Sequence, residues 1–316
     1  MSLKTDTLNC QFGLNGKIRF SEDDGLIKFT AKSRHSSLQC HLQGAHITSF
    51  IVTGSSEILW LSPLSEFKQG KVIRGGIPIC WPWFGKPANK PSDSSPKPQH
   101  GFARNSLFEV LSTAENDNGE LEITLVLNDS EQSLKIWPFR FALNLQIVVG
   151  ESLSITLTTH NLDSQTMSIT EAIHSYFKVD HIDKVALSGL ENAKFYDQIT
   201  NGESQQKEAN LKIKQEIDRI YFAPSNALEL AREEQVIAEK STLQRIKIYI
   251  EQSNANAVVV WNPWIKKSKL MTDFPDKGYI KMLCIEAANT HVHAIKILAG
   301  DSHTIQQVIR LSTLCK

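Results

Sequence analysis

The chain has 316 residues, a length compatible with one large β domain, and we expect a single domain over residues 1–316. Its 34 Lys and Arg residues balance its 34 Asp and Glu residues. A balanced charge gives no net field of the kind that draws proteins to nucleic acid or anionic lipid. We therefore expect neither partner, and any site for an anion has to be local.

The five cysteines are scattered without a C-x-x-C pair, and their odd number argues against a disulfide framework. Residues 1–11 lack the charged start and apolar run of a signal peptide. No stretch approaches the roughly 18 apolar residues that a membrane helix requires. These features predict a soluble protein of the reducing cytoplasm.

Segment 74–86 and, after a proline-rich stretch, segment 99–104 mix glycine, proline and aromatic residues with cationic side chains. Glycine lets backbone pass close to a ligand, proline stiffens a loop, and aromatic rings provide apolar platforms. Arg74 and Arg104 can each fork onto phosphate oxygens, with Lys86 as a flexible charge nearby. The pattern favours a site for an anionic, partly apolar molecule such as a phosphosugar, although either arginine could instead pair with a carboxylate.

Alternation of apolar and polar residues predicts half-buried strands at 121–125, 141–149, 153–157 and 245–250. Turn-forming residues such as Asp117-Asn118-Gly119 separate the apolar runs. Many short antiparallel strands are therefore expected.

Helical patterns are sparse, and the best candidates are 203–211 and 227–240. The second candidate also fits two strands around Glu233-Glu234. Strands do not alternate with helical patterns of about 10 to 15 residues, which argues against a doubly wound α/β fold. The expected fold class is an all-β sandwich.

His174 lies in segment 168–177, which has the composition of a strand. If the strand is regular, His174 shares a face with Thr170, Ala172 and Tyr176. A polar face that carries a histidine could line a groove. The alternative is a hydrogen-bonded structural histidine.

Glu286 follows an apolar run, and strict alternation places its side chain beside Ile280, Met282 and Cys284. A carboxylate among apolar neighbours is either paired or has a raised pKa, which is how enzymes tune a general base. The alternative is an edge position with the carboxylate in solvent.

Three further features each have a functional and a structural interpretation. His100 is close to Arg104 in the sequence, but it could be a loop residue without a role. Asp218 could accept hydrogen bonds from sugar hydroxyls, or it could pair with a neighbouring cation. The aromatic turn 261–264 could form a wall for a sugar ring, or it could pack in the core.

Common cofactor motifs are missing from the sequence. His291 and His293 could share one strand face, but no third ligand has suitable spacing, so no metal site is predicted. There is also no Walker loop, no G-x-G-x-x-G and no G-x-S-x-G, which argues against the commonest nucleotide-binding and hydrolase functions.

Taken together, short motifs in order along the chain resemble the glucose-6-phosphate 1-epimerase family, the hexose-6-phosphate mutarotases of the aldose 1-epimerase superfamily. These motifs are Arg74-Gly75-Gly76-Ile77-Pro78, Gln99-His100-Gly101-Phe102-Ala103-Arg104, His174-Ser175-Tyr176-Phe177, Asp218-Arg219-Ile220-Tyr221, Val260-Trp261-Asn262-Pro263-Trp264 and Cys284-Ile285-Glu286-Ala287.

The resemblance implies a galactose mutarotase-like β-supersandwich with its active site on a concave sheet face. It also implies that His174 and Glu286 are the catalytic pair. The implied substrate contacts are Arg74, Gln99, Arg104 and Asp218, to which we add His100 and Lys86 as candidates.

The implied activity is the interconversion of the α and β anomers of a hexose 6-phosphate. A cyclic hemiacetal opens when its anomeric hydroxyl loses a proton and its ring oxygen gains one. We expect Glu286 to take the first proton and His174 to supply the second, without a metal or organic cofactor. The alternatives are a mutarotase for free hexoses and a non-catalytic sugar-phosphate binding protein.

Overall fold

The computed structural model describes residues 3–87, 97–222, 224–225, 227–236, 242–290 and 293–312. Strands dominate this part of the chain, and they pair into antiparallel sheets. The expected all-β sandwich is confirmed.

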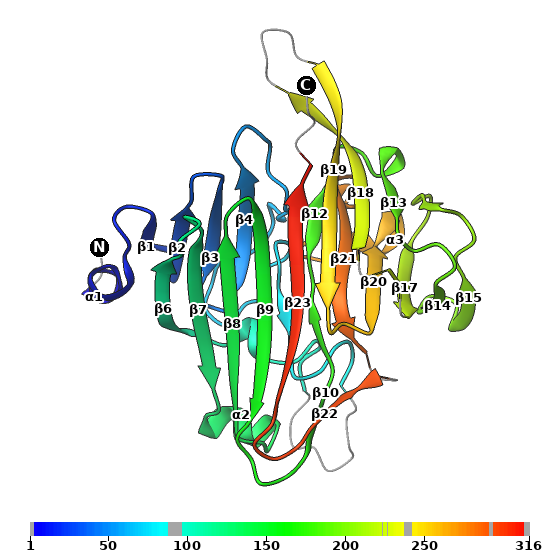
Figure 1. Cartoon of the computed structure of the whole chain (residues 1–316). Helices are drawn as coiled ribbons and strands as arrows, with labels where there is room; N and C mark the ends of the chain where they lie inside the picture. The colour runs from blue at the N-terminus through cyan, green and yellow to red at the C-terminus, as the bar shows by residue number, and fades with distance from the viewer. Residues whose placement is uncertain are drawn as a thin grey trace.

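The largest sheet has nine strands: β6 (Glu109–Glu115), β7 (Leu121–Asn128), β8 (Phe141–Val149), β9 (Ser152–Asn161), β13 (Ala186–Ser188), β16 (Asn210–Leu211), β18 (Ala227–Val236), β19 (Thr242–Ser253) and β23 (Ser302–Leu311). Their order across the sheet is β16-β13-β18-β19-β23-β9-β8-β7-β6. In Figure 1 this sheet forms the front layer. The strands predicted at 121–125, 141–149, 153–157 and 245–250 all lie in it and are confirmed.

The second sheet has eight strands: β5 (Ile79–Cys80), β11 (Glu171–Ile173), β12 (Tyr176–Lys178), β14 (Lys194–Asp197), β15 (Gly202–Gln205), β17 (Ile217–Phe222), β20 (Ala257–Asn262) and β21 (Met282–Asn289). Their order is β15-β14-β17-β20-β21-β11-β5, and β12 also pairs with β21. Every residue of β20 and β21 is buried. Both faces of this part of the sheet are therefore covered.

A third sheet of four strands consists of β1 (Ile18–Asp23), β2 (Leu26–Lys32), β3 (Ser36–His41) and β4 (His46–Val52), in chain order. A small sheet pairs β10 (Met167–Ile169) with β22 (Ile295–Ile297). The helices are short: α1 (Leu3–Phe12), α2 (Glu131–Ile136), α3 (Trp264–Ser268) and the 3-10 turns η1 (Ala103–Asn105), η2 (Ile182–Lys184) and η3 (Gly278–Lys281). In α2, Ser130 and Ser133 cap the first turn reciprocally.

One apolar core lies between the layers. Phe29 of β2, Ile147 of β8 and Ile285 of β21 come from the three larger sheets and belong to the same cluster of buried side chains. Figure 1 shows the four-stranded and eight-stranded sheets side by side behind the nine-stranded sheet. Each fully buried large apolar side chain stabilises the fold by about 1.5–3 kcal/mol relative to exposure, so this shared core holds the three sheets together.

The two predicted helices are wrong. Segment 203–211 contains most of β15 and all of β16, and segment 227–236 is strand β18, with residues 237–240 outside the described residues. The alternative of strand structure in this segment is confirmed, although β18 runs through Glu233-Glu234 without a break there. Its Leu228 and Leu230 are buried at period two, and β13 and β19 pair with it on either side. Sheet pairing thus overrides the helix propensity of its Ala, Leu and Glu residues.

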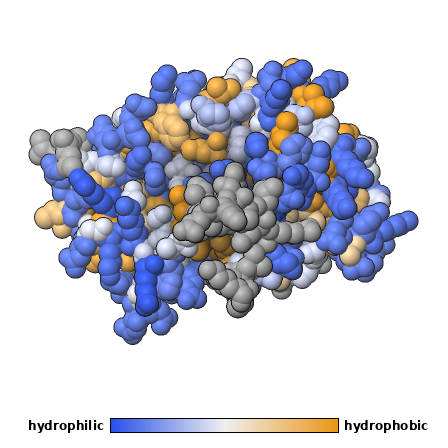
Figure 2. Space-filling model, turned by 90° about the horizontal axis from the view of Figure 1, so that it is seen from above, coloured by the Kyte–Doolittle hydropathy of each residue, from blue (hydrophilic) through white to orange (hydrophobic). Residues whose placement is uncertain are grey.

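The surface is mostly polar. Figure 2 shows hydrophilic residues over much of one end of the molecule, with apolar residues in smaller patches between them. In the described part of the chain, no helix combines the length and apolar character needed to cross a membrane.

Candidate active site

Strand β21 presents two different faces. Leu283, Ile285 and Ala287 belong to the main core between the sheets. Met282 and Cys284 belong to an aromatic cluster on the opposite face. Glu286, only 1% exposed, alternates with them on this second face. The predicted neighbours Met282 and Cys284 are confirmed, whereas Ile280 lies before the strand in η3.

The expectation of one regular strand over 168–177 is wrong. The segment is divided among β10, β11 and β12, and His174 and Ser175 lie between the last two strands. Both β11 and β12 pair with β21, which places His174 next to Glu286. The irregular backbone is anchored by the His174 amide, which donates to the Pro78 carbonyl at 3.1 Å.

His174 and Glu286 form a buried pair. The His174 Nε2 atom lies 3.3 Å from Glu286 Oε1. Burial lowers the pKa of His174 well below its usual value. Burial, reinforced by the charge of Asp218, raises the pKa of Glu286 well above its usual value. The alternative of a solvated edge carboxylate is therefore wrong.

The pair retains unused hydrogen-bonding capacity. His174 Nδ1 and Glu286 Oε2 are buried and have no hydrogen-bond partner among the described residues. An unsatisfied buried polar atom typically costs about 1–3 kcal/mol, so a fold does not retain two of them side by side without a reason. Such atoms can bind the hydroxyl groups of a ligand.

Two rings extend from His174 along the same face. The Tyr176 ring stacks on the imidazole with centroids 4.8 Å apart and planes 9° apart. The Trp60 ring stacks on Tyr176 at 5.9 Å. Trp261 contributes an edge contact to His174 at 6.3 Å and belongs to the same aromatic cluster. Trp261 therefore packs in this cluster, and its predicted role as a wall for a sugar ring stays a prediction.

Glycine lets the loop 99–104 approach the sheet. Gly101 has φ +70°, and a Cβ atom there would lie 1.9 Å from the Trp81 carbonyl oxygen. Any other residue is therefore excluded sterically. This close approach brings the His100 ring to 5.8 Å from the His174 ring. Burial, with the charges of Arg104 and Arg74, lowers the pKa of His100 to about 3, so the ring is neutral at physiological pH.

Arg104 is a cation with no acidic partner within ion-pair distance in the described part of the chain. Its Nη2 donates to the Gln99 backbone carbonyl at 2.7 Å. Burial lowers its pKa, and repulsion from Arg74 acts in the same direction. A cation in this environment would be stabilised by an anionic ligand.

Arg74, by contrast, already has hydrogen-bonding partners within the protein. Its Nε and Nη2 atoms lie 3.1 Å and 3.0 Å from Asp273 Oδ2, and its Nη1 donates to the Tyr176 hydroxyl at 3.2 Å. Arg74 therefore pairs with a carboxylate, while its predicted contact with the substrate stays a prediction. The arginine fixes the Tyr176 ring, and through it the imidazole of His174.

Asp218 lies two strands away from Glu286 on the same sheet. It pairs in register with Trp261, which in turn pairs with Cys284. One carboxylate oxygen accepts from Gln198 Nε2 at 2.6 Å, and the other lies 3.5 Å from Lys267 Nζ. The predicted pairing of Asp218 with a neighbouring cation is therefore confirmed. Its carboxylate still lies close enough to Glu286 to raise the pKa of that residue.

Gln99 and Lys86, the remaining candidates, are exposed and come from the two ends of the proline-rich stretch. Gln99 contributes its backbone carbonyl to Arg104. No role for Tyr176 or Asp273 was predicted from the sequence. Tyr176 could have been found from its two-residue spacing to His174, whereas no local pattern marks Asp273, which reaches Arg74 from 199 positions away.

One group of potential metal ligands occurs in the described part of the chain. Ligand atoms of His174, Cys284 and Glu286 lie within 4.8 Å of one another. Burial raises the pKa of the Cys284 thiol well above its usual value, and the pKa of Glu286 is raised as well. Both groups hold protons that compete with a metal ion, so the donor set suits proton chemistry better than metal binding. Of the two histidines that were expected to share a strand face, His291 lies outside the described residues and His293 lies outside the strands.

Residues 27–310 match the family model of aldose 1-epimerase. The chain therefore belongs to the aldose 1-epimerase family and is an epimerase by class. An Escherichia coli K12 protein, provisionally named glucose-6-phosphate 1-epimerase, is 37% identical over 248 residues, which cover 78% of each chain. A Cenchrus ciliaris protein with the same provisional name is 34% identical, covering 81% of this chain and 76% of the relative.

Solved structures share the fold. A provisionally named mutarotase of Salmonella typhimurium has a TM-score of 0.84 and 29% identity, covering 98% of this chain and 99% of that chain. A galactose mutarotase related enzyme from Lactobacillus acidophilus has a TM-score of 0.70 at 16% identity, covering 90% and 97%. The second likeness shows that the fold persists where little sequence identity remains.

Proposed function

We propose that the protein interconverts the α and β anomers of a hexose 6-phosphate, with glucose 6-phosphate as the preferred substrate. The observation that carries the proposal is the buried contact of 3.3 Å between His174 Nε2 and Glu286 Oε1, with Arg104 nearby and lacking an acidic partner among the described residues. The provisional names of the relatives support the choice of substrate.

The distance within the pair suits the chemistry of the anomeric carbon. The anomeric hydroxyl and the ring oxygen are bonded to the same carbon, so the two atoms that exchange protons lie close together. Two adjacent side chains can therefore serve both oxygens from one side of the ring.

Each proton transfer has a named acceptor. The Glu286 carboxylate takes the proton of the anomeric hydroxyl while protonated His174 gives a proton to the ring oxygen, and the bond from C1 to the ring oxygen breaks. Rotation about the bond from C1 to C2 exposes the other face of the aldehyde. Reclosure returns one proton to His174 and takes the other from Glu286. The chemistry is complete without a metal or organic cofactor.

The pair is suited to hold one proton over a wide pH range. The lowered pKa of His174 resists a second proton on the acid side, and the raised pKa of Glu286 resists loss of the first on the alkaline side. Moving that proton from Glu286 to His174 over 3.3 Å gives the ionised form that starts the reaction.

The phosphate is assigned to Arg104, with His100 and the exposed Lys86 as further candidates. Arg74 shapes the site through Asp273 and Tyr176. Asp218 and Gln99 are assigned to the sugar hydroxyls. A hydrogen bond between the Arg104 guanidinium and the phosphate would contribute about 1.5–3 kcal/mol to binding, enough to select a phosphosugar over the free sugar.

Anomer exchange followed by NMR on glucose 6-phosphate and on glucose tests the proposal. Acceleration of exchange on the phosphosugar, well above that on glucose, is the expected result. Equal rates on both sugars would instead identify a free-hexose mutarotase. Binding without acceleration would identify a sugar-phosphate binding protein.

We further propose that residues 1–316 act as one domain in the cytoplasm. One buried cluster draws on the three larger sheets, which supports a single folding unit. Cys10, Cys40, Cys80 and Cys284 are free thiols, which fits a reducing compartment.

A further inference from the structure

A large groove lies apart from the catalytic pair. Its volume is about 850 Å³, within the range of about 300–1,000 Å³ that is typical of small-molecule sites. Strands β3 and β4 of the four-stranded sheet form one side. Segment 56–61, the end of β12 and Arg232 of β18 form the other. The residues that line it include none that we assign to anomer exchange or phosphate binding.

His41 is a buried polar side chain that lines this groove. It is 3% exposed, and neither ring nitrogen has a hydrogen-bond partner among the described residues. Burial lowers the pKa of His41 to about 4, so the ring is neutral and offers one donor and one acceptor. Leaving the donor and the acceptor without hydrogen bonds costs free energy, which a ligand with hydroxyl groups would recover.

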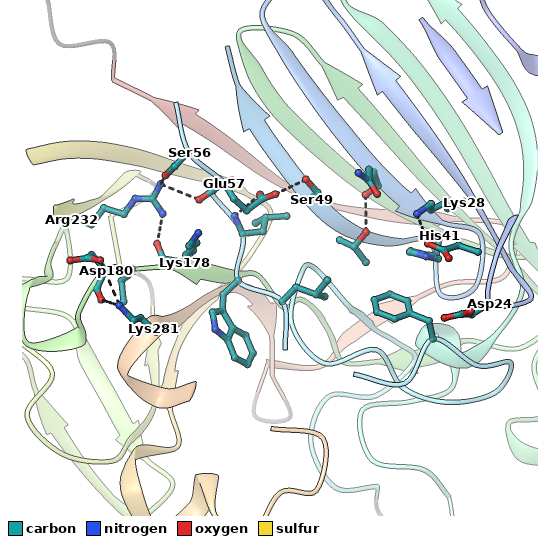
Figure 3. A pocket seen from close by; sticks show the side chains of 18 of the residues that line it. Asp24, Lys28, His41, Ser49, Ser56, Glu57, Lys178, Asp180, Arg232 and Lys281 are labelled. Carbon is teal, nitrogen blue, oxygen red and sulfur yellow. Dashed lines mark hydrogen bonds and ion pairs between the residues drawn. The ribbon is translucent and has the colours of Figure 1, made fainter. Parts of the chain in front are cut away.

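The opposite charges along the groove largely neutralise one another. Lys28 Nζ lies 2.7 Å from Asp23 Oδ2 at one end, and Lys281 Nζ lies 3.6 Å from Asp180 Oδ1 at the other. Figure 3 shows Lys28 and His41 at the first end and Asp180 and Lys281 at the second. An ionic ligand would have to compete with these pairs.

Two charged side chains, the half-buried Glu57 and the buried Arg232, build the wall between the ends. The Glu57 carboxylate accepts from Ser49 Oγ at 2.5 Å and from the backbone amides of Phe50 and Leu59. The Arg232 guanidinium donates to the backbone carbonyls of Lys178 and Glu57. Figure 3 shows Glu57 with Ser49, and Arg232 with Ser56 and Lys178, along the groove wall. Both charges therefore shape the backbone and are not directed at an ion.

Apolar surface completes the groove. Phe67 lies with its ring centroid 5.1 Å from that of His41, and Leu59, Trp60 and Leu61 line the same space. Aromatic faces bind the C–H faces of sugar rings, and a neutral imidazole binds their hydroxyls. The volume lies in the upper part of the usual range, which suits more than one ring.

We propose that this groove is a second binding site, which takes an uncharged saccharide of two or more rings against Phe67 and His41. The site is independent of the proposed function, because it uses different residues. Among the described residues that line it, Trp60 connects it to the catalytic site, because the Trp60 ring stacks on Tyr176.

The test uses maltotriose and cellotriose as neutral probes and inorganic phosphate as an ionic comparison. Saturation-transfer NMR and calorimetry are run on the whole chain, with excess glucose 6-phosphate present to fill the catalytic site. We expect at least one trisaccharide to bind under these conditions. His41→Leu and Phe67→Ala should each weaken its binding about tenfold or more, because each removes one of the two main contacts.

Phe139→Ala is the matched control, since Phe139 is a half-buried aromatic residue whose ring packs on Trp137 outside the groove. It should bind the trisaccharide like the parent, and all three variants should keep the parental rate of anomer exchange, which shows that they are folded. The proposal is overturned if neither trisaccharide binds, if glucose 6-phosphate displaces it, or if folded His41→Leu and Phe67→Ala bind it normally. Binding of phosphate alone at this groove would also overturn it.

Discussion

The two faces of β21 are equally buried, yet burial has opposite consequences on them. On the inner face Leu283, Ile285 and Ala287 join the main core, and removing them from water stabilises the fold. On the outer face Glu286 is 1% exposed among Met282 and Cys284, and burial there penalises a charge. One strand thus contributes stability on one side and reactivity on the other.

The difference shows how a sandwich can hold a reactive pair in a fixed position. The inner face holds β21 rigidly, so Glu286 cannot move outward to regain water. His174 is held against it by strand pairing on both sides of the break between β11 and β12. The free energy gained on the inner face offsets the penalty on the outer one.

Replacing Glu286, the carboxylate on the outer face, should have the largest effect on turnover. In Glu286→Gln the shape is kept but the base is lost, and we expect turnover on glucose 6-phosphate to fall by about 10²- to 10⁴-fold, the usual contribution of a proton-transfer group. Exchange rates from NMR give the ratio directly. A variant that retains near-parental turnover would remove Glu286 from the mechanism.

Truncating a side chain on the inner face should instead lower stability and leave turnover unchanged. Ile285→Ala leaves a cavity in the core and should lower the free energy of unfolding by about 2–5 kcal/mol, measured by urea denaturation. Turnover per folded molecule should stay close to parental. If Ile285→Ala lost turnover and kept its stability, the contrast between the faces would be wrong.

Arg104→Ala should weaken binding of the phosphosugar without touching the proton chemistry. The loss of a charged hydrogen bond is expected to cost about 1.5–3 kcal/mol, seen as a higher KM for glucose 6-phosphate. The kcat at saturation should change little. The matched variant Arg140→Ala removes an exposed arginine elsewhere and should leave KM unchanged.

Glu286→Gln should also change stability with pH. The folded pKa of Glu286 is raised above the ordinary value of 4.5, so its favourable contribution is complete below that value and is lost as the pH rises toward the folded pKa. Glutamine has no such dependence. Thermal unfolding should therefore show that the stability of the variant rises relative to that of the parent as the pH is raised from 4 to 8. A stability difference that stays constant over this range would contradict the raised pKa of Glu286.

The smallest effect is expected from the neighbouring carboxylate. Asp218 raises the pKa of Glu286 by repulsion, so Asp218→Asn should lower it. The alkaline fall of kcat, at which the pair loses its proton, should then move to lower pH. An unchanged or upward-shifted alkaline limb, measured at saturating substrate, would show that Asp218 does not act on Glu286 through its charge.

Local pattern was enough to place Glu286, because alternation at period two sorts the side chains of a regular strand onto two faces. It was not enough for His174, whose segment breaks into three strands, of which β10 pairs with β22 and both β11 and β12 pair with β21. The chain from 227 to 236 was predicted as helix because its Glu and Ala residues suit one, and only the flanking strands make it β18.

Contacts between remote segments explain the rest of what the sequence did not reveal. Asp273 meets Arg74 across 199 positions, so the structural role of Arg74 was not visible in its own motif. The groove around His41 has the same origin, since its sides come from β3 and β4, β12 and β18. Residue order along one segment carries no information about such pairs.

The central claim is that His174 and Glu286 act as one unit that moves protons on the anomeric centre. The most direct measurement is two-dimensional exchange NMR on glucose 6-phosphate with the parent, His174→Ala, Glu286→Gln and the double variant. If the two side chains form a single proton-transfer unit, each single variant should lose about as much as the double variant. Independent losses that multiply in the double variant, or exchange at the parental rate in either single variant, would contradict the account.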